Sequence, residues 1–343
     1  MTTRKQIGIT TTVPTEVLLA AGYMPVDLNN VFLRSHNTEE LVRVAERDGF
    51  PQNCCTWIKG IYGVCLTQNI NPVMCVTTGD CSNTVMLMEV LRLKGFDVIP
   101  FAYPERPTPR GVRRCLKSLA ENLGTTLESA EEARKGLMQC RSLADRLDEL
   151  TWKQGLISGW ENHLWLVSTS DFNTDAHQYE RNLREVIDES QRRKPYHGDM
   201  LRLAYIGVPP LFAEDLYRYV EQQEARVVFN EVQRQFAMPK RGKSLPEQYA
   251  EYTYPYSIFD RLQDIQAQLD LRQVDGVIHY VQTFCHRGIG DIIFRHAIHI
   301  PLLTLEGNAD YILPQRSRTK IEAFLDMLRR RKRLPNQQRG RKV

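Results

Sequence analysis

Two blocks of alternating strand-like and helix-like segments constrain the fold of this chain more than any other feature of its sequence. The first block has expected helices over 14–22, 38–47, 57–66 and 83–95 and expected strands over 23–28, 72–78 and 96–101. The second has expected strands over 203–207, 226–229, 276–280 and 301–305 and expected helices over 211–224, 257–269, 289–297 and 315–330. Because parallel strands need a crossover between them, this alternation indicates parallel sheets. We predict an α/β fold made of two similar units.

A stretch from 107 to 193 that reads as almost wholly helical separates the two blocks, with apolar residues at heptad-like spacing around Leu116 and Leu137. The polar segment 192–199 then breaks the pattern, as links between domains do. The expected regions are an N-terminal α/β domain (1–150), a helical connector (151–198), a C-terminal α/β domain (199–334) and a basic tail (335–343).

Length and composition are those of a soluble protein with two domains of ordinary size: 343 residues, 42% of them hydrophobic and 25% charged. No apolar run approaches the roughly 20 residues that span a bilayer. The first residues are not followed by the apolar core of a signal peptide. We therefore expect a cytoplasmic protein without membrane contact. In a reducing compartment its eight cysteines favour metal binding or catalysis over disulfides.

The C-terminal end is strongly basic, with eight Lys or Arg and no acidic residue from Arg329 to Lys342. Such a tail can touch nucleic acid, grip an acidic partner or form a solvated end. No recognition motif accompanies it, so we do not expect nucleic-acid binding.

Three cysteine-centred segments, 53–60, 78–84 and 282–286, carry most of the chemical information. Cys55 comes just before an expected helix, whose dipole stabilises a thiolate. Cys81 and Cys285 follow expected strands, where α/β folds place ligands. Three thiolates that converge on one cleft would form a soft-metal site, with iron–sulfur as the leading candidate. Position alone leaves burial without a ligand equally open for these three residues.

The remaining five cysteines lack the same indication of a ligand role. Whether Cys54 is a ligand stays open, because the thiols of adjacent residues point in different directions. One thiol of the Cys54-Cys55 pair could lie next to the ligands without binding the metal. We expect the others to be buried in the core: Cys65, Cys75, Cys115 and Cys140. A zinc site is disfavoured, since it usually needs a close pair such as Cys-x-x-Cys, which the chain lacks.

Three further residues are candidate catalytic groups. Lys59 lies four residues after Cys55, on the same face of a helix, and could stabilise negative charge on a cluster or substrate; the alternative is a solvated lysine. His286 could donate a proton or bind a cluster sulfur, or simply lie at the surface. Glu16 could act as an acid or base, or form a structural ion pair. Asp80 and Ser82 are expected to cap the helix after Cys81. No Walker A motif is present, so the chain should not hydrolyse ATP itself.

Several motifs resemble the 2-hydroxyacyl-CoA dehydratase D-component family, which also contains benzoyl-CoA reductase subunits and double-cubane cluster proteins. The N-terminal run 9–26 is similar to its N-terminal signature, and 300–306 with 316–325 to its closing segment. Cys55 to Gly63 looks like its first cluster-cysteine motif, and Phe284-Cys285 like the third. One departure concerns Cys81: many members have Cys-Asp after the paired threonines, whereas this chain has Gly79-Asp80-Cys81, so its ligand role requires a shifted loop.

The resemblance implies two flavodoxin/Rossmann-like domains with an iron–sulfur cluster in the cleft between them. The implied ligands are Cys55, Cys81 and Cys285, around a [4Fe-4S] cluster with one open iron. The implied partners are an ATP-dependent iron–sulfur activator protein, a second homologous subunit or a second copy of the chain, and an acyl-CoA thioester substrate. The implied reaction is a radical dehydration or reduction of that thioester.

Two alternatives remain open. The chain could be a double-cubane [8Fe-9S] protein that reduces small molecules, since its spare cysteines, including Cys54, would permit a larger cluster. It could also be a non-catalytic electron-relay or scaffold subunit.

Overall fold

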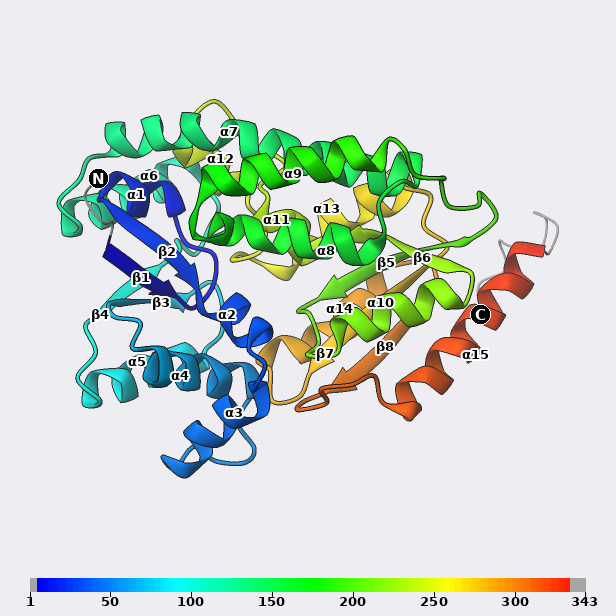
Figure 1. Cartoon of the computed structure of the whole chain (residues 1–343), viewed down its shortest axis with the longest axis horizontal. Coiled ribbons are helices and arrows are strands. Elements are labelled where there is room, and N and C mark those ends of the chain that lie inside the picture. The colour runs from blue at the N-terminus through cyan, green and yellow to red at the C-terminus, as the bar shows by residue number, and fades with distance from the viewer. Residues whose placement is uncertain (1–4, 334–343) are drawn as a thin grey trace.

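The computed structural model describes residues 5–333 and contains two four-stranded sheets in which every strand pairing is parallel. The strands of the first sheet are β1 (Lys5–Ile9), β2 (Tyr23–Asp27), β3 (Val73–Thr78) and β4 (Val98–Ala102). Those of the second are β5 (Leu201–Gly207), β6 (Ala225–Asn230), β7 (Gly276–Gln282) and β8 (Leu302–Gly307). The predicted α/β class with two flavodoxin/Rossmann-like units is confirmed, and the units lie side by side (Figure 1).

Helices surround both sheets. In the first half they are α1 (Thr15–Ala20), α2 (Leu28–Arg34), α3 (Thr38–Arg47), α4 (Thr56–Gln68), α5 (Asn83–Leu93) and α6 (Pro109–Asn122). The middle of the chain forms α7 (Leu127–Glu149), the π-helix η1 (Leu150–Gln154), α8 (Gly159–Val167), the short 3₁₀ turns η2 (Ser168–Ser170) and η3 (Phe172–Thr174), and α9 (Ala176–Ser190). The second half adds α10 (Ala213–Gln222), α11 (Glu231–Phe236), α12 (Leu245–Glu251), α13 (Ile258–Leu271), the 3₁₀ turn η4 (His286–Gly290), α14 (Asp291–Ala297) and α15 (Gln315–Arg333).

The two sheets repeat one topology. The first has the order β2-β1-β3-β4 and the second β6-β5-β7-β8, so in each the first strand in sequence lies between the second and the third. The chain therefore leaves the first strand in one direction and returns on its other side. In parallel α/β sheets such a switch point opens a crevice at the carboxyl ends of the strands, where ligands bind.

The strands are mostly buried on both faces, as β5 and β6 show, because helices cover both sides of a parallel sheet. Side-chain caps mark the start of several helices. Thr108 accepts from the backbone of α6, Thr126 from that of α7, and Ser158 forms a capping box with Glu161 at the start of α8. Local sequence therefore sets many of the element boundaries.

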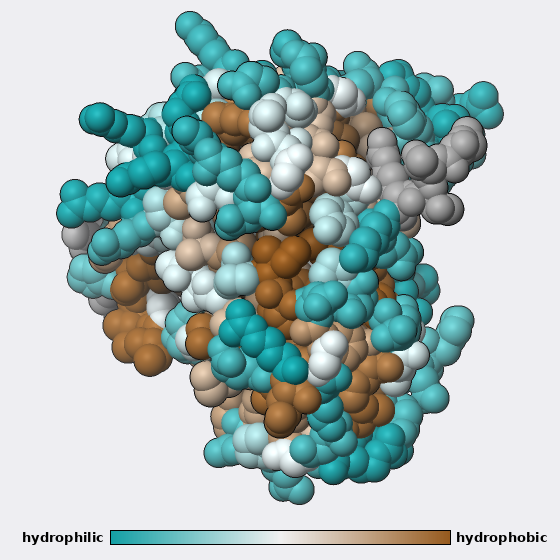
Figure 2. Space-filling model, turned by 90° about the vertical axis from the view of Figure 1, so that its left-hand side faces the viewer, coloured by the Kyte–Doolittle hydropathy of each residue, from teal (hydrophilic) through white to brown (hydrophobic). Residues whose placement is uncertain are grey.

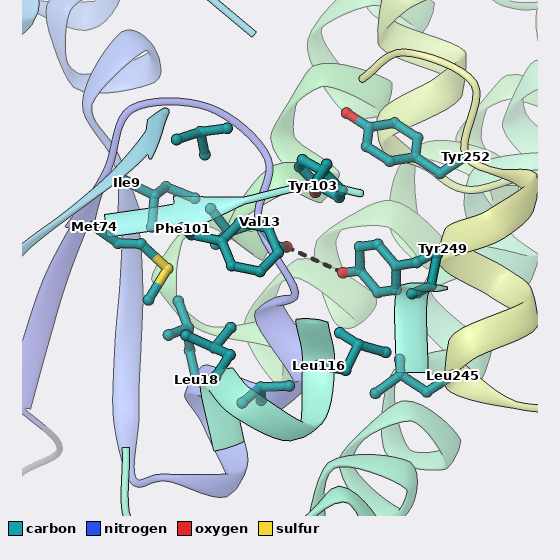
Figure 3. Packing of buried hydrophobic residues seen from close by; sticks show 14 of the residues in the cluster. Ile9, Val13, Leu18, Met74, Phe101, Tyr103, Leu116, Leu245, Tyr249 and Tyr252 are labelled. Carbon is teal, nitrogen blue, oxygen red and sulfur yellow. Dashed lines mark hydrogen bonds between the residues drawn. The ribbon is translucent and has the colours of Figure 1, made fainter. Parts of the chain in front are cut away.

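The core of the first unit contains a segment from the second half of the chain. Residues 231–256, between β6 and β7, place Leu245, Tyr249 and Tyr252 against the residues around β4 (Figure 3). The hydroxyl of Tyr249 donates to the carbonyl oxygen of Val13 at 3.0 Å. The boundary expected near 199 would assign this segment to the second domain, whereas its side chains complete the hydrophobic core of the first.

The predicted helical stretch forms a layer along one edge of the molecule, where α7 and α9 run from the side of the first sheet to the side of the second (Figure 1). Its core is a separate cluster of buried residues that includes Leu137, Leu147, Leu166, Tyr179 and Leu183. This layer positions α8 and the turn after it next to the space between the sheets.

Some elements were not expected from the sequence, namely β1, α2, α11 and α12. β1 is five residues long and is followed by the threonine run 10–12, and the three helices are only six or seven residues long. The basic tail expected over 335–343 lies outside the described residues. Within 5–333, no helix has both the length and the apolar character that a membrane span requires.

The surface on the side of the first sheet is mainly hydrophilic, with separate apolar patches (Figure 2). Met86 and Leu93 of α5 are among the exposed large apolar side chains, at 62% and 84% exposure. Single exposed apolar residues are normal on protein surfaces.

Candidate cluster site

A cavity of about 110 Å³ lies where the switch points of the two sheets face each other. Thr10 follows β1 and Asp80 follows β3 in the first sheet; Val208 follows β5 and Cys285 follows β7 in the second. All four residues line the cavity, which is several times the roughly 10–15 Å³ that one water molecule needs. The two crevices that the sheet topology creates therefore merge into one site.

The three candidate cysteines all line this cavity. Cys55 is the residue before α4, Cys81 lies in the loop from β3 to α5, and Cys285 lies between β7 and η4. Cys55 is buried and the other two are partly buried. Residues separated by more than 200 positions thus line one cavity.

Gly79 shapes the loop that carries Cys81. Its φ of +100° lies in the region that favours glycine, and a Cβ at this position would be 2.8 Å from the Cβ of Pro255. The loop can therefore turn tightly against the 231–256 segment and still present Cys81 to the cavity. The shifted Gly79-Asp80-Cys81 order is compatible with a cysteine at this site.

The three sulfurs share one local feature. The backbone N–H two residues after the cysteine is directed at its sulfur: Trp57 at Cys55, Asn83 at Cys81 and Arg287 at Cys285, and each of these hydrogen bonds lowers the pKa of its thiol. Of the eight cysteines, all of which lie in the described residues, only these three have a backbone donor at this spacing. Such donors stabilise a thiolate.

Burial raises the pKa of the three thiols, and this effect outweighs that of the backbone donors. It raises the pKa of Cys55 to about 11 and that of Cys81 to about 12, and it also raises the pKa of Cys285. Negative charge nearby adds to this effect: Asp80 raises the pKa of Cys81, and Cys285 raises the pKa of both Cys81 and Cys55. Three thiolates at this site require a nearby positive charge, which bound iron would supply while displacing the thiol protons.

Three residues of the cavity lining also carry a buried polar atom without a partner. The indole Nε1 of Trp57, the hydroxyl of Thr84 and the Nε of Arg287 have no hydrogen-bond partner among the described residues, and all three side chains line the cavity. They follow Cys55, Cys81 and Cys285 by two or three positions. A buried donor without an acceptor is costly, so the site fits a guest rich in acceptor atoms, such as the sulfides of an iron–sulfur cluster.

The sulfurs do not form a compact site for one ion. Within residues 5–333, no three His, Cys, Asp or Glu side chains are grouped closely enough to hold a single metal ion. A polynuclear cluster does not need its ligands grouped around one ion, because each thiolate binds a different iron.

Cys54 and Lys59 lie beside the site rather than in its lining. Cys54 is partly buried next to Cys55, and the charge of Lys59 lowers its pKa while burial raises it. The ammonium of Lys59 is buried, 2.7 Å from Oε1 of Glu46 and 3.2 Å from the carbonyl oxygen of Gln52. The expected alternative, a solvated lysine, does not describe this residue: it joins α4 to α3 through an ion pair.

His286 lines the cavity and is exposed at its surface. Burial of its ring and the positive charge of Arg287 lower its pKa, so the imidazole is neutral at pH 7. It can therefore accept a proton at the open side of the site.

Glu16 lies outside the cavity lining, in the core of the first unit. Its carboxylate accepts hydrogen bonds from Arg141 at 2.8 Å, Tyr249 at 2.7 Å and Gln248 at 2.9 Å. Burial raises the pKa of Glu16, but the charge of Arg141 and these hydrogen bonds outweigh it and lower the pKa. The geometry is that of the structural ion pair named above as the alternative to an acid/base role.

Sequence reasoning missed the network that joins the two cysteine loops. Arg287 donates to the carbonyl oxygens of Gly79 at 2.9 Å and Tyr254 at 3.2 Å, and Tyr254 donates to Asp80 at 2.9 Å. Asp80 therefore binds Tyr254 rather than capping α5 with its side chain, and Ser82, at the cap position, forms no side-chain cap either. The one signal in the sequence was the position of Arg287 directly after Cys285-His286.

The fold and the site define a class: a protein of two parallel α/β units with a cysteine-lined cavity at their facing switch points. The family model described as 2-hydroxyglutaryl-CoA dehydratase, D-component, matches residues 10–328, and the chain belongs to this family. The family suggested by the motifs is thereby confirmed over nearly the whole chain. A comparison with curated proteins finds no match.

Proposed function

We propose that this chain is an iron–sulfur enzyme component that holds one [4Fe-4S] cluster through Cys55, Cys81 and Cys285 and acts on an acyl-CoA thioester. The observation that carries the proposal is the repeated arrangement at one cavity: three thiols, each with a backbone N–H donor two residues later, at the carboxyl ends of two facing sheets. Membership of a dehydratase family supports an enzymatic role.

The residues of the chain have separate tasks in this proposal. Cys55, Cys81 and Cys285 bind iron, and the donors of Trp57, Thr84 and Arg287 neutralise negative charge on sulfur. When bound, such a cluster supplies a low-potential electron and an open iron that polarises a substrate oxygen.

Water exclusion and proton handling fall to other residues. Apolar side chains such as Ile58, Val232 and Phe236 keep water from much of the cavity, which strengthens every charge interaction inside it. The neutral imidazole of His286 can hold a proton that leaves or enters the substrate.

A single cubane fits this site better than a double cubane. Three cysteines line the cavity, and the other five, Cys54 included, do not. An [8Fe-9S] cluster needs ligands for about twice as many irons. The double-cubane alternative would therefore require Cys54 and its loop to rearrange.

Electrons have to arrive from a partner, which we propose to be an ATP-dependent iron–sulfur activator protein. Next to Cys285 the surface exposes Phe284, Ile289 and Ile292, at 49%, 75% and 70%. Adjacent exposed apolar residues are typical of interaction sites. Phe284 directly precedes Cys285, so a partner docked here would lie near a proposed ligand. A homologous subunit or second copy of the chain would also find apolar area here.

Iron and sulfide analysis tests the cluster. The chain, purified and reconstituted without oxygen, should hold about four irons and four sulfides. Separate serine substitutions of Cys55, Cys81 and Cys285 should lower that content, whereas the matched control Cys115→Ser, at a partly buried cysteine away from the cavity, should keep it. About eight irons would favour the double cubane, and iron-free, colourless protein would contradict the proposal.

Turnover separates an enzyme from an electron-relay or scaffold subunit. Reconstituted chain mixed with an activator of this family, ATP and a 2-hydroxyacyl-CoA should release the unsaturated thioester. A cluster that is reduced by the activator without any product would favour the relay alternative.

A further inference from the structure

We propose that Asn308 is a positioning residue of the cysteine site, whose side chain fixes Cys55 and Cys285 relative to each other across the two units. The inference rests on the proposed function in one respect, since it takes these two cysteines to be cluster ligands. Asn308 lies outside the cavity lining. It acts through two neighbours, Thr56 and Gln282, each of which belongs to one cysteine segment.

The pairing of two strands brings Asn308 next to the Cys285 segment. Asn308 directly follows β8, and β8 runs parallel to β7, so both strands end at the same edge of the second sheet. The pairing reaches Gln282 and Gly307, and the backbone N–H of Thr283 then donates to the carbonyl oxygen of Gly307 at 2.8 Å. Asn308 therefore lies beside the strand end that leads to Cys285.

The side-chain amide of Gln282 joins Asn308 to the Cys285 segment. Its Nε2 donates to Oδ1 of Asn308 at 3.0 Å and to the backbone carbonyl oxygen of Asn308 at 3.3 Å. Its Oε1 accepts a hydrogen bond from the hydroxyl of the buried Tyr280 at 3.2 Å, which holds the amide in this orientation. The backbone carbonyl oxygen of Gln282 accepts from the backbone N–H of Cys285 at 3.1 Å. The turn that carries Cys285 is thus anchored at Gln282.

The hydroxyl of Thr56 joins Asn308 to the Cys55 segment. It donates to Oδ1 of Asn308 at 2.7 Å, across 252 positions of sequence. Thr56 is the first residue of α4 and is 1% exposed, and Cys55 is the residue before it. The backbone carbonyl oxygen of Cys55 accepts from the backbone N–H of Lys59 at 3.3 Å, in the first turn of the helix. The bond at Thr56 therefore fixes the start of α4 together with Cys55.

One oxygen atom, Oδ1 of Asn308, thus accepts hydrogen bonds from both segments. A carbonyl oxygen has two lone pairs, so it can hold both donors at once. A side chain without an acceptor at this position would leave two donors unpaired, which is costly because Thr56 is buried. The Cys81 segment is held differently, through the bond from Arg287 to the carbonyl oxygen of Gly79. Loss of the Asn308 oxygen should therefore loosen two of the three cysteine segments and spare the third.

Hydrogen exchange tests the positioning without any need for a cluster. In the iron-free chain, Asn308→Leu should raise amide exchange in residues 59–62 and 285–288 by about threefold to tenfold, which corresponds to one or two lost hydrogen bonds. Exchange in residues 78–84 should not change. Asn308→Asp keeps an acceptor oxygen and should restore the original rates. Unchanged exchange in the first two segments of Asn308→Leu, an equal rise in all three, or no recovery in Asn308→Asp would overturn the inference.

Substitutions of Thr56 test the same contact from the other side. Thr56→Val removes the hydroxyl, keeps a side chain of the same shape and should raise exchange in residues 59–62, whereas Thr56→Ser keeps the hydroxyl and should not. The matched control Thr151→Val removes a hydroxyl from a residue that is also 1% exposed and lies outside the cavity lining, and should leave that segment unchanged. A Thr56→Val protein with the exchange rates of the unaltered chain would contradict the role of this bond.

Release of iron to a chelator gives a second readout and keeps the two proposals apart. From the reconstituted chain, Asn308→Leu should release iron about threefold to tenfold faster than the unaltered protein, and Asn308→Asp at the original rate. A chain that binds no iron but shows the exchange changes would overturn the cluster and leave the role of Asn308 standing. An iron-loaded Asn308→Leu protein that releases iron at the original rate would overturn the role of Asn308 alone.

Discussion

The phenolic hydroxyl of Tyr254 donates a hydrogen bond to Oδ1 of Asp80 at 2.9 Å, across 174 positions of sequence. Tyr254 belongs to the segment between β6 and β7, and Asp80 directly precedes Cys81. The bond therefore ties the loop that carries one candidate ligand to the part of the second half that packs in the first core.

We expect Tyr254→Phe to reduce the free energy of unfolding by about 1–3 kcal/mol, because the partly buried carboxyl of Asp80 loses its hydroxyl donor. Urea denaturation measures this. The control Tyr219→Phe removes a hydroxyl bonded to Glu322, which is exposed, and should cost less, since water replaces the lost bond. An equal loss of unfolding free energy in the two variants would show that the hydrogen bond to Asp80 stabilises the protein no more than an exposed one.

The buried donors without partners lead to a prediction for the reduction potential of the proposed cluster. Trp57→Phe and Thr84→Val each remove one unpartnered donor of a residue that lines the cavity, which should destabilise the more negative, reduced cluster. A hydrogen bond of about 0.5–1.5 kcal/mol corresponds to a fall of roughly 20–60 mV in a one-electron potential. Redox titration followed by EPR measures it, with Trp160→Phe, outside the cavity lining, as the matched control. Potentials identical to the unaltered protein would show that these donors do not face the cluster.

The ion pair of Glu16 and Arg141 is buried at 0% and 1% side-chain exposure. Glu16→Gln should therefore destabilise the protein by about 3–5 kcal/mol, because it leaves the charge of Arg141 buried without a partner. The double variant Glu16→Gln with Arg141→Met should recover much of that loss in chemical denaturation. A folded Glu16→Gln protein with a full cluster but no turnover would instead give Glu16 the acid/base role considered from the sequence.

Asp171 predicts a pH dependence of stability. Burial, together with the neighbouring Asp27, raises its pKa to about 7 in the folded protein. The folded state therefore binds more protons than the unfolded state between about pH 4 and 7, so the contribution of this group to stability falls as the pH rises through that window. Asp171→Asn removes the group and should flatten the decline. Unfolding free energies at several pH values check this, and an equally steep decline in the variant would exclude Asp171 as its source.

Much of the fold was predictable from local sequence. The strands β2 to β8 and the longer helices have the apolar periodicity and the caps that their sequences indicate, and parallel sheets follow from the alternation. β1 escaped prediction because its two buried isoleucines are followed by a threonine-rich run. The short helices α11 and α12 escaped because their burial comes from the first core rather than from their own pattern.

The site was predictable in part. The strand-end positions of Cys81 and Cys285 and the pre-helical position of Cys55 could be derived, and the structure places all three at one cavity; their role as ligands stays a prediction. Trp57 and Thr84 had no distinguishing signal and Arg287 only its position after Cys285-His286, since a donor is known to lack a partner only when its surroundings are known. Lys59 and Glu16 were candidates for chemistry, and each is held in an ion pair outside the cavity lining.

The sequence by itself determined two parallel α/β units and the ends of strands and helices at which the three cysteines lie, because periodicity, caps and crossovers are local properties. Only the tertiary structure decided that the two switch points face each other, that residues 231–256 complete the first core, and that Arg287 joins the two cysteine loops. Those features depend on the packing of segments that can lie more than 200 positions apart in the sequence. No local pattern encodes which distant surface a side chain will meet.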